Sequence, residues 1–363
     1  LWQLGVAAVV PADASPDDLA AALLGAAPGS GSGGGPGSHT GSYAGPLGPS
    51  GRAVAPRRPS GADGVDPLGP VDPGALEQPE PGRILVVWGP AGAPGRTTVA
   101  VNLAAELALR GREVLLVDAD TYGGCVAQTL SVLDEAPGLV AAARAAETGA
   151  LDLFALARLA LVIGPRLRVL TGIPRAERWP EIRGPALERV LTVGRSLASH
   201  VVVDIGSCLE DDEELSYDTQ APRRNQAALA ALAVADELVV VGGCDPVALQ
   251  RLVRGLQDLG SIRSPRPVVV VNRLRAGPIG AGPGRLVTDA LSRFAGVTEA
   301  HLVPDDPAAV DAAMLAGRSL AEVAPGSAAR AAIGALAGRL AGASDPLPGA
   351  RHTARRGRVR RRG

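Results

Sequence analysis

The sequence contains no lysine, so all 36 of its basic residues are arginines. This absence excludes chemistry that needs a lysine amine, such as a Schiff base, a lysine general base or the lysine of a standard phosphate-binding loop. Aromatic residues are also scarce, at 2% of the 363 residues, whereas glycine and proline number 47 and 31. Such a composition is typical of a GC-rich genome, so most of it carries no information about function.

Cysteines and long apolar runs are few as well. Cys125, Cys208 and Cys244 are the only three cysteines, and no Cys-x-x-Cys spacing occurs. This pattern argues against a zinc site or a disulfide framework and favours a reducing cytoplasm. No run of 18 uninterrupted apolar residues occurs, because the nearest one, 151–163, carries two charged residues. A membrane-spanning helix is therefore not expected.

Composition divides the chain into four segments. Residues 1–25 read as one strand and one capped helix, and they resemble the last such unit of a response-regulator receiver domain whose front is missing. Residues 26–81 are so rich in glycine and proline that we expect a disordered linker, because little apolar surface can be buried to offset chain entropy. Residues 82–342 form the expected folded domain, and residues 343–363 an Arg-rich disordered tail.

Within the expected domain, apolar runs rich in β-branched residues alternate with helical stretches. Continuous apolar strands between helices are typical of a mainly parallel sheet that is covered on both faces. The pattern predicts a doubly wound α/β fold, in which ligands bind beyond the carboxyl ends of the strands. The expected strands are 84–88, 114–117, 201–203, 238–241 and 268–271, and the expected helices are 96–109, 186–198, 225–235, 246–259 and 328–340.

A loop rich in glycine and proline follows the first strand and opens the first helix, with the sequence Gly89-Pro-Ala-Gly-Ala-Pro-Gly-Arg-Thr-Thr98. A phosphate-binding loop belongs at this position, because backbone N–H groups and the helix dipole then face the anion. The motif departs from the standard pattern, since Pro90 stands in place of the first glycine and Arg96 in place of the lysine. A turn that binds no ligand is the alternative reading of this segment.

Three aspartates follow at the ends of later strands. Asp118 and Asp120 lie two residues apart, and so on one face, at the end of the second strand. Asp204 ends an apolar strand in the manner of a Walker B carboxylate that serves a metal ion. Each aspartate taken singly is equally well a turn former or a helix cap. Their order behind the loop favours a nucleotide site.

In these motifs the chain resembles the ParA/MinD superfamily of P-loop ATPases, and specifically its CpaE/TadZ-like branch, which joins a degenerate receiver domain to such an ATPase. The resemblance covers about residues 83–340 and includes the strand ending in Asn272-Arg273 and the segment Leu302-Val-Pro-Asp-Asp306. It implies a doubly wound, mainly parallel sheet that binds ATP with Mg²⁺. It assigns Gly92, Ala93, Gly95, Arg96, Thr97, Thr98, Asn272 and Pro304 to the nucleotide, Thr97, Asp118 and Asp204 to the metal, and Arg96 and Asp120 to catalysis.

The roles that the resemblance implies are specific. Asn272 and the region of Pro304 would contact adenine, Thr97 would bind Mg²⁺ and Asp204 would support the ion through water. Asp120 would orient the attacking water or a switch segment.

The departures from the family pattern concern charge. The family has two lysines in this loop, and here Ala91 and Arg96 stand in their places. A planar, forked guanidinium cannot simply replace a compact ammonium between phosphates. The loss of one charge that stabilises a transferring phosphoryl group costs about 2.7–4 kcal/mol, by analogy with a lost oxyanion-hole donor. Pro90 and Pro94 also lack N–H donors. We therefore expect ATP binding to survive and hydrolysis to be slow.

Two further charged segments lie after Asp204. Arg223-Arg224 could restore the charge that the loop has lost, but a solvated pair is the favoured reading. The acidic run Glu210–Glu214 is expected to be a solvated loop.

The resemblance also implies partners. We expect a nucleotide-dependent homodimer that serves a pilus, polar or septal assembly and is recruited from the cytoplasm to a cell pole or the inner face of the membrane. A nucleotide-free scaffold and a DNA-segregation ATPase are the alternative functions. Residues 351–363 hold seven arginines and no acid, so they could contact DNA or anionic lipid weakly, or simply keep the chain soluble.

Overall fold

The computed structural model describes residues 81–132, 136–211 and 222–342. The receiver-like unit expected at 1–25, the linker up to residue 80 and the Arg-rich tail at 343–363 lie outside the described residues. The helices within the described ranges are all too short or too polar to cross a membrane.

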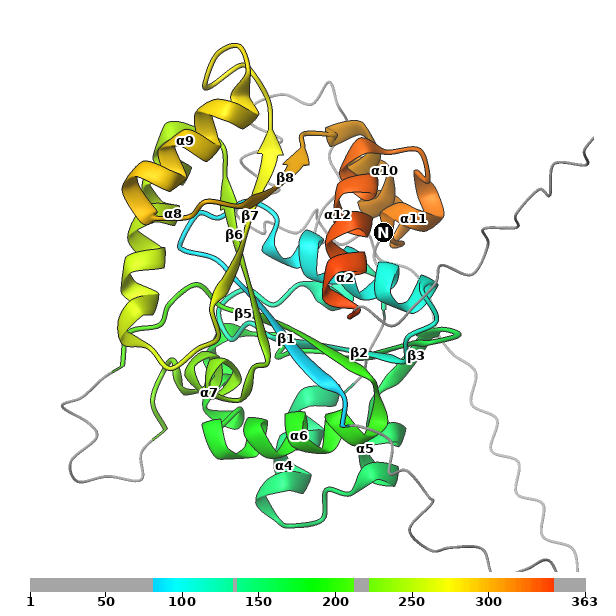
Figure 1. Ribbon diagram of the computed structural model, residues 1–363. Coiled ribbons are helices and arrows are strands. Elements are labelled where there is room, and N and C mark those ends of the chain that lie inside the picture. The colour runs from blue at the N-terminus through cyan, green and yellow to red at the C-terminus, as the bar shows by residue number, and fades with distance from the viewer. Residues whose placement is uncertain (1–80, 133–135, 212–221, 343–363) are drawn as a thin grey trace, which may run out of the picture. The chain divides into compact units, whose positions relative to one another are not determined.

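One eight-stranded sheet forms the centre of the domain, with the strand order β3-β4-β2-β5-β1-β6-β7-β8 (Figure 1). β3 is antiparallel to β4, and the other neighbouring strands are parallel. The mainly parallel sheet predicted from the sequence is thereby confirmed. The strands are β1 (Arg83–Trp88), β2 (Val114–Ala119), β3 (Leu161–Gly164), β4 (Leu167–Leu170), β5 (His200–Ile205), β6 (Glu237–Gly243), β7 (Pro267–Leu274) and β8 (Ala300–Pro304).

Helices cover both faces of this sheet, as Figure 1 shows. One face packs against α4 (Gly138–Glu147), α5 (Leu153–Leu159), α6 (Gly184–Leu197), α7 (Gln226–Val234), α8 (Pro246–Asp258) and α9 (Pro283–Ala295). The other face packs against α2 (Arg96–Leu109), α3 (Val126–Thr129), α10 (Pro307–Ala316), α11 (Leu320–Val323) and α12 (Ala328–Leu340). Two short 3₁₀ helices, η2 (Ala176–Glu181) and η4 (Leu259–Ser261), complete the described elements.

The pleat of β1 explains why the central strands are apolar throughout. Ile84, Val86 and Trp88 belong to the core on one side of the sheet, whereas Leu85 and Val87 belong to the core on the other side. Successive side chains of a strand point to opposite faces, so a strand covered on both faces is apolar along most of its length. This strand ends at Trp88, and the loop of glycine, proline and alanine that carries the candidate site follows it.

Candidate functional site

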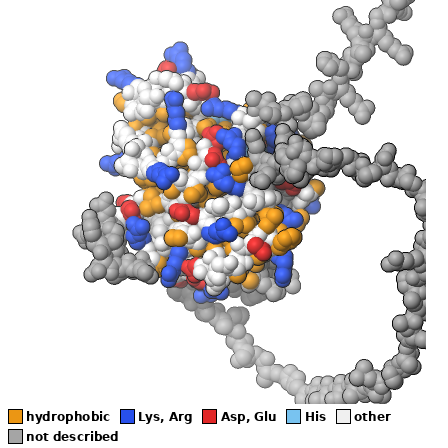
Figure 2. Space-filling model, turned by 60° about the horizontal axis from the view of Figure 1, so that its bottom comes forward, with side chains coloured by type: hydrophobic (Ala, Val, Ile, Leu, Met, Phe, Trp, Pro, Cys, Tyr) orange, Lys and Arg blue, Asp and Glu red, His pale blue; other side chains and the backbone are white. Residues whose placement is uncertain are grey.

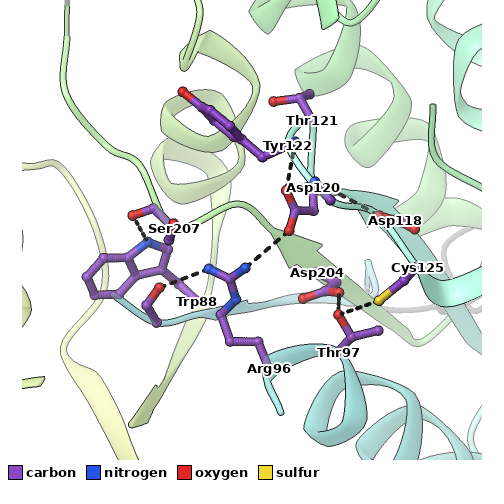
Figure 3. Close-up of polar contacts among 12 residues, drawn as sticks. Trp88, Arg96, Thr97, Asp118, Asp120, Thr121, Tyr122, Cys125, Asp204 and Ser207 are labelled. Atoms are coloured by element: carbon purple, nitrogen blue, oxygen red, sulfur yellow. Dashed lines mark hydrogen bonds and ion pairs between the residues drawn. The ribbon is translucent and has the colours of Figure 1, made fainter. Parts of the chain in front are cut away.

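The candidate site lies at the carboxyl ends of β1, β5 and β2, which are neighbours in the sheet. The register places Asp204 of β5 opposite Val87 of β1 on one side and opposite Asp118 of β2 on the other. The loop 89–95 follows β1 and leads directly into α2. The three predicted aspartates and the predicted loop are thus brought together at one edge, as Figure 3 shows for their side chains.

Two glycines shape the loop. Gly92 has a φ of 78° and Gly95 a φ of 81°, which is the left-handed region that side chains other than glycine rarely adopt. The Ala93 N–H donates to the carbonyl of Pro90 at 2.9 Å and closes a tight turn. Gly95 is the N-cap of α2, so the helix opens with N–H groups that have no partner within it. Thr97 and Thr98 lie in that first turn, where an anion is favoured.

Arg96 folds back toward the ends of the strands. Its Nη1 donates to the carbonyl of Gly89 at 3.0 Å, and its Nη2 pairs with Asp120 Oδ2 at 3.1 Å (Figure 3). The other oxygen of Asp120 accepts the N–H groups of Tyr122 and Gly123 at 2.9 and 3.1 Å. Arg96 therefore ties the loop to the turn after β2, and the predicted contact of Arg96 with a phosphate stays a prediction.

Thr97 and Asp204 form the second polar contact of the loop. The Thr97 hydroxyl donates to Asp204 Oδ2 at 2.5 Å, and the Cys125 thiol lies 3.5 Å from the same hydroxyl (Figure 3). Asp204 is fully buried, and its Oδ1 has no hydrogen-bond partner among the described residues. Burial, reinforced by the nearby Asp118 carboxylate, raises the pKa of Asp204 to about 8.

Asp118 is engaged by the backbone of the following turn. Its Oδ1 accepts the Asp120 N–H at 3.3 Å, and its Oδ2 accepts the Val126 N–H at 3.1 Å. Burial raises the pKa of Asp118 to about 7, against the effect of these two hydrogen bonds. Gly124 packs so closely against this carboxylate that a Cβ there would lie 2.7 Å from Oδ1. These contacts show a side chain that holds the 120–126 turn, and its predicted role as a metal ligand stays a prediction.

Asn272 and Pro304 border a separate cavity on the other side of the loop. This cavity measures about 310 Å³ and is also lined by Gly95 and Thr98. The Asn272 Nδ2 donates to the carbonyl of Pro94 at 2.9 Å and fastens the loop to β7. The next residue, Arg273, has a φ of 54°, which is a strained backbone conformation for a residue with a side chain. Such strain is found preferentially at ligand sites.

Comparison with known proteins identifies the family. Residues 85–307 match the model of the CobQ/CobB/MinD/ParA nucleotide binding domain. The chain belongs to this family. The predicted superfamily is confirmed, whereas its CpaE/TadZ-like branch stays a prediction.

Solved structures show the same fold. The ParA family ATPase of Chlorobium tepidum TLS matches with a TM-score of 0.61 and 21% identity, over 72% of this chain and 99% of that chain. The MinD of Pyrococcus horikoshii OT3, solved as a complex with Mg-ADP, matches with a TM-score of 0.55 and 19% identity, over 71% and 95%. The iron-sulfur cluster carrier protein of Mycobacterium tuberculosis is 28% identical over 240 residues, which are 63% of this chain. The chain spans only 57% of that relative's length.

In this member of the nucleotide-binding family, Mg²⁺ fits the pair of Thr97 and Asp204. An unpartnered, buried carboxylate oxygen is a group that a cation would satisfy, and Mg²⁺ takes one or two protein oxygens and completes its shell with phosphate and water. No cluster of three His, Cys, Asp or Glu side chains in the described ranges could hold a metal by itself.

The contacts of Arg224 were not predicted from the sequence. The prediction that residues 223–224 form a solvated pair is wrong for Arg224. The Arg224 guanidinium lies 3.6 Å from the centroid of the Tyr122 ring and donates to the side chain and carbonyl of Thr121 at 2.9 and 3.0 Å. Arg223 does pair at the surface, with Asp211 at 2.8 Å. Of the acidic run, Glu210 and Asp211 are described and the remainder lies outside the described residues.

The same cluster links two segments that flank the site. The Tyr122 hydroxyl donates to Asn225 Oδ1 at 2.7 Å, and the Asn225 amide donates to the carbonyl of Glu210 at 2.7 Å. The turn after Asp120 is thereby joined to the segments that follow β5. The chain offers no local signal for this link, because its partners are far apart in sequence.

Proposed function

We propose that the protein binds ATP together with Mg²⁺ at the loop 89–98 and that nucleotide occupancy controls its dimerisation or its docking on a partner assembly. The observation that carries this proposal is the contact between Thr97 and Asp204, with an unpartnered buried carboxylate oxygen beside the N-terminus of α2. Membership of the nucleotide-binding family and the Mg-ADP bound by a structural relative support it.

Each part of the site has a task in this proposal. The free N–H groups at the start of α2 bind phosphate oxygens. Thr97 and Asp204 hold Mg²⁺, which when bound neutralises charge on the phosphates. The cavity beside Asn272 and Pro304 accepts the base.

Slow hydrolysis is part of the proposal. Ala91 contributes no charge, and the Arg96 guanidinium is engaged by the Gly89 carbonyl and the Asp120 carboxylate. A residue that must first break an ion pair stabilises a transferring phosphate less than a preorganised one. We propose, from the family resemblance, that the assembly served is a pilus, polar or septal structure.

Calorimetry on the full chain tests the nucleotide part. We expect wild-type protein to bind ATP in a Mg²⁺-dependent manner. The Asp204→Asn variant should lose that dependence while keeping the fold of the wild type. Asp289→Asn removes a carboxylate on α9 that lies 3.9 Å from Arg285 at the surface, and it should bind like wild type. An absence of ATP binding by the wild type would refute the proposal.

A nucleotide-free scaffold is the second candidate, because specific observations favour it. The Ala93 N–H is already bonded to Pro90, and Arg96 is paired within the site. A scaffold predicts the same background ATP turnover for the wild type and Asp204→Ala, so one turnover assay on both proteins separates the two candidates.

DNA segregation receives less support from the described surface. Figure 2 shows basic and acidic side chains interspersed on one face of the described domain, with no extended region of one sign. Non-specific DNA binding depends on a concentration of positive charge. The Arg-rich tail lies outside the described residues, so its contribution is tested separately. We expect deletion of 351–363 to weaken DNA binding across a salt series if the tail is responsible.

A further inference from the structure

The loop itself presents no uncommitted cation to a nucleotide. Position 91 is alanine, and the Arg96 guanidinium is held by the Gly89 carbonyl and the Asp120 carboxylate. A bound triphosphate nevertheless carries several negative charges that a protein site neutralises with metal and with arginine or lysine. A positive group from another element would complete such a site.

Arg251 on α8 places its guanidinium against this loop. Its Nη1 lies 2.3 Å from the point that a Cβ on Gly92 would occupy, and its Cζ lies 3.5 Å from that point. A side chain at position 92 would displace the guanidinium from this place. Among the described residues, Arg251 forms no ion pair, so no described acid neutralises its charge by direct contact.

The backbone that carries Arg251 is held firmly against the loop. One turn further along α8, a Cβ on Gly255 would lie 3.0 Å from the Trp88 ring and 3.2 Å from Pro90. The helix begins at an N-cap, Asp245, whose side chain accepts the N–H groups of Val247 and Ala248. The position of α8 relative to Gly92 is therefore set by close packing and not by the arginine itself.

Two cavities border opposite ends of the loop. Together they determine the orientation in which a nucleotide would bind, with the base at one end and the last phosphate at the other. The cavity assigned to the base is lined by Gly95 and Thr98. The second cavity, of about 870 Å³, is lined by Pro90, Ala91 and Arg251. A nucleotide whose base lies in the first cavity and whose phosphates cross the start of α2 points its last phosphate toward the second cavity.

We propose that Arg251 supplies, from α8, the phosphate-facing charge that position 91 lacks, and that it contacts the terminal phosphate of bound ATP. This inference rests on the proposed function. A guanidinium is always charged and its planar fork matches two phosphate oxygens at once. The residue consequently distinguishes ATP from ADP, because only ATP has a phosphate within its reach.

Calorimetric titration of the full chain with Mg-ATP and, separately, with Mg-ADP tests the inference. We expect Arg251→Ala to weaken ATP binding about tenfold or more, the loss of one or two charge-assisted hydrogen bonds, and to change ADP binding about twofold or less. Arg189→Ala is the matched control, since this exposed arginine lies on α6 and lines neither of the two cavities. It should bind both nucleotides like wild type.

A rescue variant keeps the test independent of folding defects. Ala91→Lys in the Arg251→Ala background returns a positive charge to the same end of the loop, and we expect it to restore the preference for ATP over ADP. Equal affinities of wild type and Arg251→Ala for ATP would overturn the inference while leaving ATP binding itself intact. An equal loss for ATP and ADP would also overturn it. A wild type that binds neither nucleotide would refute the proposed function, and this inference with it.

Discussion

At the scale of single residues, Asp204 is the group on which the proposed metal site depends. One of its oxygens accepts the Thr97 hydroxyl and the other has no hydrogen-bond partner among the described residues. A buried polar group left unsatisfied costs about 1–3 kcal/mol, and the same burial raises the pKa of the carboxyl to about 8. A bound divalent cation would satisfy the unpartnered oxygen and favour the ionised carboxylate. It would thereby remove the free-energy cost of the missing hydrogen bond and that of ionisation in a buried position. Ligand binding is therefore expected to stabilise the folded protein.

Removal of the Thr97 hydroxyl tests this pair. We expect Thr97→Val to weaken Mg-ATP binding about tenfold or more, because an oxygen ligand is lost, while ATP binding without Mg²⁺ changes little. The variant also leaves Asp204 Oδ2 without its donor, so the free energy of unfolding should fall by about 1–3 kcal/mol.

The matched control is Thr97→Ser, which keeps the hydroxyl and should restore both properties. Calorimetry with and without Mg²⁺ measures the first effect, and urea denaturation measures the second. Mg-ATP binding by Thr97→Val that equals that of wild type would show that the hydroxyl is not a ligand.

At the scale of elements, the contact between α8 and the loop after β1 sets the geometry of the proposed phosphate site. A Cβ on Gly255 would approach Trp88 and Pro90 more closely than ordinary packing allows. Helix propensity alone disfavours glycine in the middle of a helix by about 1 kcal/mol relative to alanine. Packing therefore explains this glycine, and the strand, the loop and the helix act as one unit.

Gly255→Val tests the fit of α8 on the loop. We expect the free energy of unfolding to fall by about 1–3 kcal/mol through overpacking, although helix propensity favours the substitution. The displaced helix should also weaken ATP binding. The control is Gly338→Val on α12, where a Cβ would meet only the Arg110 guanidinium at 3.5 Å. Denaturation curves measure the free energy of unfolding of both variants. Equal values for Gly255→Val and Gly338→Val would contradict the expected overpacking.

At the scale of the whole molecule, a histidine at the amino end of β5, opposite the candidate site, contributes to the pH dependence of stability. His200 begins β5 and is buried. Burial, with the positive charges of Arg112 and Arg83, lowers its pKa from 6.5 to about 4. In the unfolded chain the histidine binds a proton near its ordinary pKa, whereas in the folded protein it does not. The contribution of His200 to the free energy of unfolding is therefore complete above about pH 6.5 and is lost as the pH falls toward 4, whereas the raised pKa values of Asp118 and Asp204 act in the opposite direction between about pH 8 and pH 4.

Replacement of His200 should flatten this dependence. Between about pH 7 and pH 5, we expect the histidine to account for a loss of about 1–2 kcal/mol in the free energy of unfolding, after allowance for solvent screening. His200→Gln should lose less stability over the same interval. His301→Gln is the control, since His301 is a half-buried histidine on β8. Identical pH profiles for wild type and His200→Gln would refute the assignment.

Much of the fold follows from local pattern. The central strands were predictable because burial on both faces makes them continuous apolar runs, and helix 96–109 was predicted with the bounds that the structure has. The short strands β3, β4 and β8 were not predicted. β4 is buried, but it has only four residues and one of them is Arg168, so it does not form a continuous apolar run. Val162 and Ile163 of β3 are exposed, and most of β8 is only half-buried. Strands at the edge of a sheet are not enclosed on both faces, so they lack the pattern that marks the central ones.

The sequence by itself determined that a glycine-rich loop opens α2 behind an apolar strand, that aspartates end the neighbouring strands, and that lysine is absent from the loop. Only the tertiary structure decided where the positively charged arginine side chains lie. It paired Arg96 with Asp120, stacked Arg224 on Tyr122 and set Arg251 against Gly92. The physical reason is that a side chain with a long reach meets partners chosen by strand order and helix packing. Those partners lie far away along the chain, where no local pattern can indicate them.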